Sequence, residues 1–184
     1  MTGSGLLGWR VAVAGIAPAG EEVAFAAAPR ERATLAKENG LVEVKALCLT
    51  ARLDRDAKGG VTVEGRLTAE IVQSCVVTLA PVAQSIDEPV SVRFVAAGSP
   101  ELPASAKPGA EIVIHADEPD PPEILDGPWL DLGALAQEHF VLAIDPYPRA
   151  PGATLGPEAV APEGDDDSPF AALTALAGKA PARR

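Results

Sequence analysis

The chain has 184 residues, more than the roughly 100–150 of a typical single domain and too few for two, which predicts one domain with extended appendages. Hydrophobic residues make up 47% and aromatic residues 4%, so valine, leucine, isoleucine and alanine must fill the core. The net charge is −11, and the acid lies in residues 67–184, where six basic residues face eighteen acidic ones. Such a surface disfavours broad binding of RNA phosphates and attracts basic proteins.

Two cysteines, Cys48 and Cys75, are too few for a disulfide framework and lie in apolar stretches, which fits a reducing compartment. The apolar run at residues 11–19 has no positively charged beginning and is interrupted by Gly15 and Pro18, unlike a signal peptide. No segment reaches the ~18–20 apolar residues that span a membrane. We therefore expect a cytoplasmic protein that does not bind membranes.

The first elements are two short strands and a helix. Residues 9–13 alternate as a strand, and residues 23–25 predict a second. Pro29 is suited to the first turn of a helix, and the pair Asn39-Gly40 is suited to its end. The charged residues of this helix leave three apolar ones to face inward, namely Ala33, Leu35 and Ala36.

The clearest pattern is a long β-hairpin. Residues 41–53 and 61–72 are alternating runs rich in β-branched side chains, and the polar, glycine-containing residues 54–60 join them. In the second arm every second side chain, here called the apolar parity, is small or apolar, and the side chains between them are polar. A half-buried antiparallel strand requires this alternation. The apolar parity consists of Val61, Val63, Gly65, Leu67, Ala69 and Ile71.

The middle of the chain predicts shorter strands and loops. Residues 76–79 resume extended structure until Pro81, which marks an edge or an end because proline cannot donate to a ladder. Residues 89–95 predict a strand, and residues 96–110 predict an irregular stretch. A further short strand is expected at residues 111–115, and an acidic loop at residues 117–123.

The last part predicts a helix, a linker and a tail. Asp131 is a plausible N-cap, and the prolines of residues 146–151 end the helix that follows it. The helix turns one side inward, formed by Leu132, Leu135, Ala136, His139, Phe140 and Ala143. We expect an α+β fold: one domain at residues 1–155 with an antiparallel sheet, a long hairpin, two to three helices and extended acidic loops. An acidic flexible linker at residues 156–167 and a short C-terminal helix and tail at residues 168–184 complete the chain.

No residue pattern indicates catalysis. The only histidines, His115 and His139, have no motif around them, so a nucleophile such as Cys75 lacks an identifiable base. Zinc binding is the alternative, but Thr78 stands where a Cys-x-x-Cys knuckle needs its second thiolate. No glycine-rich phosphate loop follows a strand. We predict no enzyme activity, no cofactor and no metal ligands.

Direct RNA binding is a second alternative. Arg52, Arg55, Lys58 and Arg66 all lie in or near the hairpin, where they could form a modest basic patch for phosphate. Trp9 could add base stacking, or it could lie in the core.

Residues 65–81, which read GRLTAEIVQSCVVTLAP, resemble the YceD family of large ribosomal RNA subunit accumulation proteins. Four further blocks follow the family's order, at residues 33–36, 131–133, 145–152 and 168–173, and Trp9-Arg10-Val11 precedes them. The resemblance implies a non-enzymatic, bacterial ribosome-biogenesis factor that supports accumulation or processing of 23S ribosomal RNA. Some relatives carry Cys-x-x-Cys at the Cys75 position and further Cys or His near the later loop, which implies a zinc site there.

We expect the Cys75 turn and the loop at residues 145–152 to lie near each other and to form a partner-binding surface. A ribosomal protein or the pre-ribosomal large subunit is the expected partner, since the acidic half of the chain suits a basic protein. Tyr147 and Arg149 are the natural anchors, because an aromatic ring and a planar guanidinium bind well at a desolvated contact; both could instead only lock the loop. The predicted surface consists of Cys75, Thr78, Pro81, Asp145, Tyr147, Pro148, Arg149 and Gly152.

Overall fold

The computed structural model describes residues 6–102 and 120–156. The strand expected at residues 111–115, most of the acidic loop, and the linker and helix expected beyond residue 156 lie outside the described residues. The chain divides into two compact units, Met1–Ala150 and Pro151–Arg184. In the second unit, residues 151–152 form a turn in which Gly152 has φ +75°, and residues 153–156 have no regular structure.

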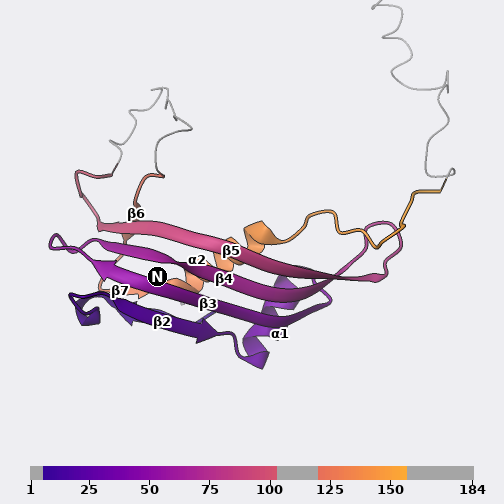
Figure 1. The fold of residues 1–184 in the computed structure, drawn as a ribbon, viewed down its shortest axis with the longest axis horizontal. Helices are drawn as coiled ribbons and strands as arrows, with labels where there is room; N and C mark the ends of the chain where they lie inside the picture. The colour runs from indigo at the N-terminus through magenta and orange to yellow at the C-terminus, as the bar shows by residue number, and fades with distance from the viewer. Residues whose placement is uncertain (1–5, 103–119, 157–184) are drawn as a thin grey trace, which may run out of the picture. The chain divides into compact units, whose positions relative to one another are not determined.

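The first unit is a mixed α+β fold, as predicted (Figure 1). Its main sheet has five strands in the order β2-β3-β4-β5-β6; they are antiparallel except for β6, which runs parallel to β5. Strands β1 and β7 form a separate antiparallel pair. The elements in chain order are β1 (Arg10–Ala12), a 3-10 turn (Val13–Gly15), β2 (Glu21–Ala26), α1 (Pro29–Glu38), β3 (Glu43–Arg55), β4 (Val61–Ser74), β5 (Pro81–Ala96), β6 (Glu123–Leu125), β7 (Trp129–Asp131) and α2 (Leu132–Ala143).

Strands β3 and β4 are neighbours in the sheet because β-branched and apolar residues alternate along them. The buried apolar side chains of β4 are those of Val61, Val63, Leu67, Ala69 and Ile71, all from the alternating apolar set that the sequence predicted. Gly65 shares this parity, and a Cβ atom there would lie 2.2 Å from the carbonyl oxygen of Thr50. The close approach of the two backbones therefore requires glycine at this position.

Strand β5 is longer than predicted. Its sixteen residues run without interruption through Pro89, which pairs with Arg66 of β4, whereas the sequence predicted a strand only from residue 89 onward. Among the described residues β6 meets only Phe94–Ala96, so this stretch of β5 is the edge of the sheet. Proline is tolerated at an edge, since a missing N–H on the open side breaks no ladder bond.

The prediction of an extended segment at residues 76–79 is wrong. Residues 76–78 form a turn, and β5 begins at Pro81. The N–H of Cys75 donates to the carbonyl of Ala80 at 2.8 Å, and the N–H of Leu79 donates to the carbonyl of Cys75 at 3.0 Å. These two bonds reverse the chain between β4 and β5. The sequence predicted a strand here because β-branched residues such as Val76 and Val77 favour extended structure.

Helix α1 begins at Pro29 and ends before Gly40, which has φ +65°. Leu35 and Ala36 are buried, as predicted, but Ala33 is exposed. Two residues of helix rotate by about 200°, so a side chain two positions before Leu35 points away from the sheet.

Helix α2 covers the sheet on the face turned away from the viewer in Figure 1, against β4 and β5. The Asp131 carboxylate caps it by accepting the N–H of Ala134 at 2.9 Å, as predicted. Phe140 is the largest of its fully buried side chains. The N–H of Gly133 donates to the carbonyl of Trp9 at 3.0 Å, which joins the helix to the N-terminal segment. Within the described residues no helix is long and apolar enough to cross a membrane.

Candidate functional site

The turn between β4 and β5 encloses the sulfur of Cys75, whose side chain is fully buried. The sulfur accepts three backbone N–H groups: from Val77 and Thr78 at 3.4 Å each, and from Ala150 at 3.2 Å. Two of these donors belong to the turn, and the third belongs to the loop after α2. Cys75 therefore holds together two segments that are 75 positions apart in the chain.

These hydrogen bonds favour the thiolate. The N–H of Ala150 contributes most, followed by the hydroxyl of Thr78, and together with the turn amides they lower the pKa of Cys75 from its ordinary value of 9.0 to about 6, against the opposing effect of burial. The side chain is buried, so these hydrogen bonds join the turn to the loop in the interior of the protein.

A second set of contacts fixes the backbone of the loop after α2. The N–H of Val76 donates to the carbonyl of Pro148 at 2.9 Å, and the N–H of Tyr147 donates to the Asp145 carboxylate at 2.8 Å. Pro148 is buried. The loop at residues 144–150 is thus attached to the turn by a main-chain bond, and the Asp145 carboxylate fixes its conformation from within.

Two glutamines hold the start of this loop. The amide of Gln73 donates to the carbonyl of Asp145 at 2.8 Å, and that of Gln84 donates to the carbonyl of Ala143 at 2.9 Å. The Gln84 carbonyl accepts the N–H of Asp145 at 3.1 Å. Gln73 is 6% exposed and its own side-chain oxygen has no partner among the described residues. Neither glutamine was predicted, although a polar residue on the buried parity of β4 was a signal for Gln73.

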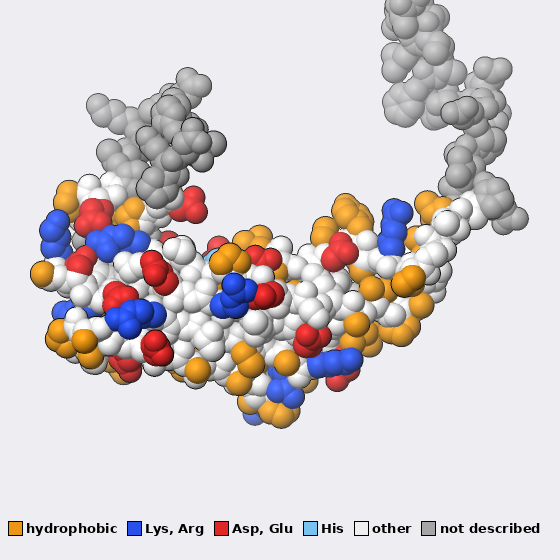
Figure 2. All heavy atoms as spheres, in the orientation of Figure 1, with side chains coloured by type: hydrophobic (Ala, Val, Ile, Leu, Met, Phe, Trp, Pro, Cys, Tyr) orange, Lys and Arg blue, Asp and Glu red, His pale blue; other side chains and the backbone are white. Residues whose placement is uncertain are grey.

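The hydrogen bonds between the β4–β5 turn and the loop after α2 form a fixed framework, and three large apolar side chains on these two segments are exposed. Leu79 is 79% exposed, Tyr147 72% and Val76 48%. Leu79 also has φ +61°, the only non-glycine residue in the described chain with a positive φ. Figure 2 shows hydrophobic side chains gathered over the β4–β5 turn and the loop after α2. We call Val76, Leu79 and Tyr147 the turn surface.

A comparison with protein families matches residues 63–177 to the family described as large ribosomal RNA subunit accumulation protein YceD. The chain belongs to the YceD family. The matched span contains all but the first two residues of β4, the Cys75 turn, β5, α2 and the loop after it. The resembling segments at residues 9–11 and 33–36 lie outside it. No curated protein and no solved structure matches the chain.

The structure brings together most of the residues predicted for the partner-binding surface of this family member. Cys75 and Asp145 lie within the framework, Pro148 is buried, and Thr78, Pro81, Tyr147 and Arg149 are exposed around it. Gly152 lies in the second unit, of which only the turn conformation is described. Leu79 and Val76 were not predicted, because the segment that contains them was read as a strand. Whether these residues bind a partner stays a prediction.

The basic residues of the hairpin do not form a patch of one sign. Arg52 pairs with Asp54 at 3.0 Å and lies directly across from Glu64, and Arg66 pairs with Asp87 at 2.5 Å. Basic and acidic side chains are interspersed on the face of the sheet in Figure 2. Phosphate binding is weakened where carboxylates already accompany the cations.

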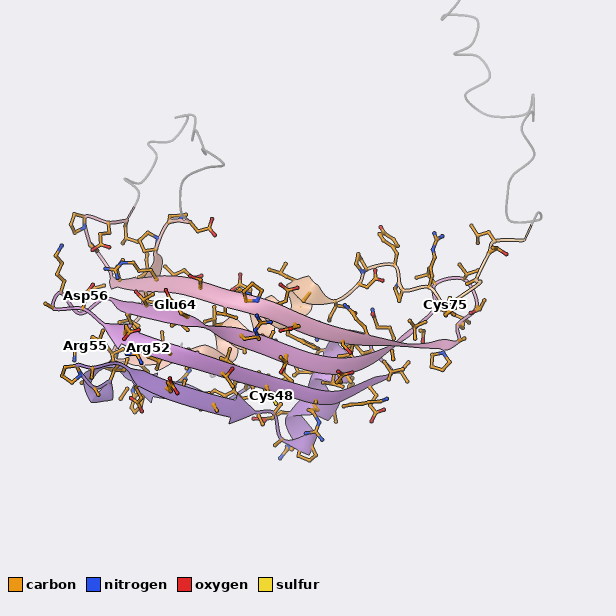
Figure 3. All side chains as sticks on the ribbon, in the orientation of Figure 1. Cys48, Arg52, Arg55, Asp56, Glu64 and Cys75 are labelled. Atoms are coloured by element: carbon orange, nitrogen blue, oxygen red, sulfur yellow. The ribbon has the colours of Figure 1, made fainter. Side chains whose placement is uncertain are left out.

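The hairpin turn itself is also balanced in charge. Arg93 of β5 is bridged by Asp56 of the turn at 2.6 Å and by Glu101 at 2.8 Å, and Arg93 lowers the pKa of both carboxyls. Arg55 and Asp56 lie at the opposite end of the sheet from Cys75 (Figure 3). Lys58 is in the same turn, where its N–H donates to the Asp56 carboxylate at 2.7 Å. Trp9 is buried and stacks on Phe25 with ring centroids 5.5 Å apart, so it is not free to stack on a base.

Within residues 6–102 and 120–156, no group of three or more His, Cys, Asp and Glu side chains could hold a metal ion. Thr78 supplies an N–H and a hydroxyl to the Cys75 sulfur where a second thiolate would be needed for zinc. In this chain the turn is closed by hydrogen bonds among its own groups.

The shifted titration of Cys75 predicts a pH dependence of stability. A depressed pKa in the folded state contributes stability that is complete above the unfolded value of 9.0 and is lost as the pH falls through about 6. We expect the difference in urea midpoint between the unmodified chain and Cys75→Ser to widen from pH 6 to pH 9, since serine does not titrate there. Cys48→Ser, the same replacement at the other cysteine, is the control for the effect of the substitution itself. A difference for Cys75→Ser that stays constant or narrows contradicts the assignment.

Proposed function

We propose that this chain is a non-enzymatic cytoplasmic factor in the accumulation of large-subunit ribosomal RNA, and that it acts by binding a ribosomal or assembly protein at the turn surface. Membership of the YceD family supports the ribosome-related role. The conformation of Leu79 is the observation that carries the choice of surface.

Leucine at φ +61° is strained, because the left-handed conformation brings Cβ close to the following carbonyl oxygen. Glycine would fit the turn without this cost. The strain is not repaid by packing, since the Leu79 side chain is 79% exposed. A strained backbone that exposes a large apolar side chain is expected where that side chain has a partner.

The surface is also organised in advance. Val76 and Tyr147 flank main-chain bonds that tie the turn to the loop, and the Cys75 sulfur closes the same contact from inside. Binding to a fixed surface loses less conformational entropy than binding to free loops. Tyrosine is a frequent anchor of protein interfaces, so Tyr147 suits the same partner.

Leu79→Gly is expected to change the stability of the protein and its binding to a partner in opposite directions. The variant is expected to raise the free energy of unfolding by about 1 kcal/mol, because the strain is relieved while no buried contact is lost. It is expected to lower the fraction of tagged protein that co-sediments with large-subunit precursor particles by at least about threefold, which corresponds to a loss of at least about 0.6 kcal/mol in binding free energy. Gradient sedimentation of cell extracts and urea unfolding measure the two effects.

Val42→Ala is the control, because Val42 is also a large hydrophobic residue exposed to solvent, and it lies on the connection from α1 to β3. It should leave co-sedimentation unchanged. If the unmodified chain is absent from every pre-ribosomal fraction, the ribosomal role is wrong. If it is present and Leu79→Gly binds equally well, the choice of the turn surface is wrong.

Direct RNA binding by the hairpin predicts a different result. Reversing two charges in Arg52→Glu/Arg66→Glu should abolish retention of ribosomal RNA by the pure protein at physiological salt if the hairpin is the site. Because both arginines already pair with carboxylates, we expect little retention by the unmodified chain and no further loss in the variant. Filter binding with labelled ribosomal RNA decides between the two.

A further inference from the structure

A groove of about 460 Å³ lies between β6, β7 and the first half of α2. Its walls include two large apolar side chains that remain open to solvent: Ile124 is 57% exposed and Trp129 52%. The volume falls in the range of ligand-binding clefts, roughly 300–1,000 Å³. An exposed tryptophan in a concavity is uncommon on a surface that binds nothing, since its indole would gain by burial.

The groove is acidic. It is lined by one arginine, Arg10, and by four carboxylates, Glu123, Asp126, Asp131 and Glu138. Arg10 is already engaged, at 3.0 Å from Asp131. Within the part of the chain that the structure describes, none of the other three carboxylates forms an ion pair, which leaves three negative charges around an open apolar floor.

One of these carboxyls is affected by its neighbours. Burial raises the pKa of Glu123, the neighbouring charge of Glu138 raises it further, and only His139 acts in the opposite direction. A positive charge bound between Glu123 and Glu138 would remove this repulsion. A cation over the indole face of Trp129 would gain from the same site.

We propose that this groove binds a peptide segment in which arginine or lysine alternates with an apolar residue. The basic side chains would lie between Glu123, Glu138 and the Trp129 ring, and the apolar residue would cover Ile124. Charge complementarity selects this partner: a nucleic acid or an acidic segment is repelled by the same three carboxylates. The chain's own residues 103–119 carry Glu111, Asp117 and Glu118 against a single Lys107, so they are poorly matched to the groove.

The test uses the full chain and a short fluorescent peptide in which arginine alternates with leucine. A counterpart with glutamate in place of arginine serves as the charge control. We expect the basic peptide to bind in fluorescence anisotropy at physiological salt and the acidic one not to bind. Trp129 emission should change on binding, because Trp9 is buried and the indole of Trp129 is the exposed one.

Glu123→Gln/Glu138→Gln is expected to weaken binding roughly five- to tenfold, and Trp129→Ala at least about threefold. The matched control is Glu22→Gln/Glu64→Gln, which removes the same charge from the β2–β4 face of the sheet. It should change binding by less than about twofold.

Absence of binding by the full chain overturns the proposal, including the case in which its own residues fill the groove. An equal loss in both double variants overturns it as well, because attraction would then come from net charge alone. The readout needs no ribosomal particle, so its failure is distinguishable from failure of the turn surface as a partner site.

Discussion

Gly65→Ala is expected to lower the free energy of unfolding by about 3 kcal/mol, at the upper end of what overpacking usually causes. The added Cβ would lie 2.2 Å from the carbonyl oxygen of Thr50 and 2.7 Å from the Cα of Ala51. Both obstacles are backbone atoms of β3, the strand paired with β4 on this side, so no side chain can rotate away. The strands would have to separate at the middle of the sheet, where Leu49 and Leu67 are fully buried as neighbours of the site.

Gly8→Ala is the control for this measurement. A Cβ at Gly8 meets nothing within 4 Å, and its backbone does not require glycine. Its effect should stay within about 0.5 kcal/mol, as for surface substitutions in general. Urea unfolding followed by circular dichroism compares the three proteins. Equal stability of Gly65→Ala and the unmodified chain contradicts the close approach of β3 and β4 at this point.

The sheet was predictable where one face of a strand is buried and the other is exposed to solvent. The period-two pattern of β4 identifies the buried set from Val61 to Ile71 because every second side chain must enter the same core. The cap of α2 was predictable for a similar reason, since Asp131 precedes an apolar helix and its carboxylate accepts a free N–H. Both signals are local in the sequence.

The elements that were missed depend on distant partners. Strands β6 and β7 have three residues each, too few for a pattern, and they exist because β5 and β1 supply hydrogen bonds across the chain. The groove beside α2 arises from these two strands and was therefore not predictable. The continuation of β5 through Pro89 depends on its position at the edge of the sheet, which sequence spacing does not show.

The candidate site was predictable as a meeting of two segments but not in its chemistry. The sequence predicted that Cys75 lies near residues 145–152, and the structure adds that its sulfur accepts three backbone N–H groups. The positive φ of Leu79 cannot be read from its side chain, because leucine normally avoids that conformation. The exposure of the Leu79 side chain therefore could not be predicted from the sequence.

Phe140→Ala is expected to lower the free energy of unfolding by about 3–5 kcal/mol, because it leaves a cavity where a fully buried ring fills the space between α2 and the sheet. Phe140→Leu keeps most of that volume and should lower it by about 1 kcal/mol. Chemical unfolding of the two variants measures the difference. Similar losses in both would mean that α2 does not depend on the ring for its packing.

The same substitution should disturb the turn surface from a distance. Helix α2 leads directly into the loop that donates the Ala150 N–H to Cys75, and that bond contributes most to lowering the pKa of the thiol. When α2 loses its anchor, the loop opens more often and the buried sulfur becomes accessible. In a Cys48→Ser background, Phe140→Ala should therefore raise the rate at which a thiol reagent modifies Cys75 by at least about tenfold relative to Phe140→Leu, the factor for 1.4 kcal/mol of easier opening. Equal rates in the two variants would show that the glutamines and the Val76 main-chain bond hold the loop without the helix.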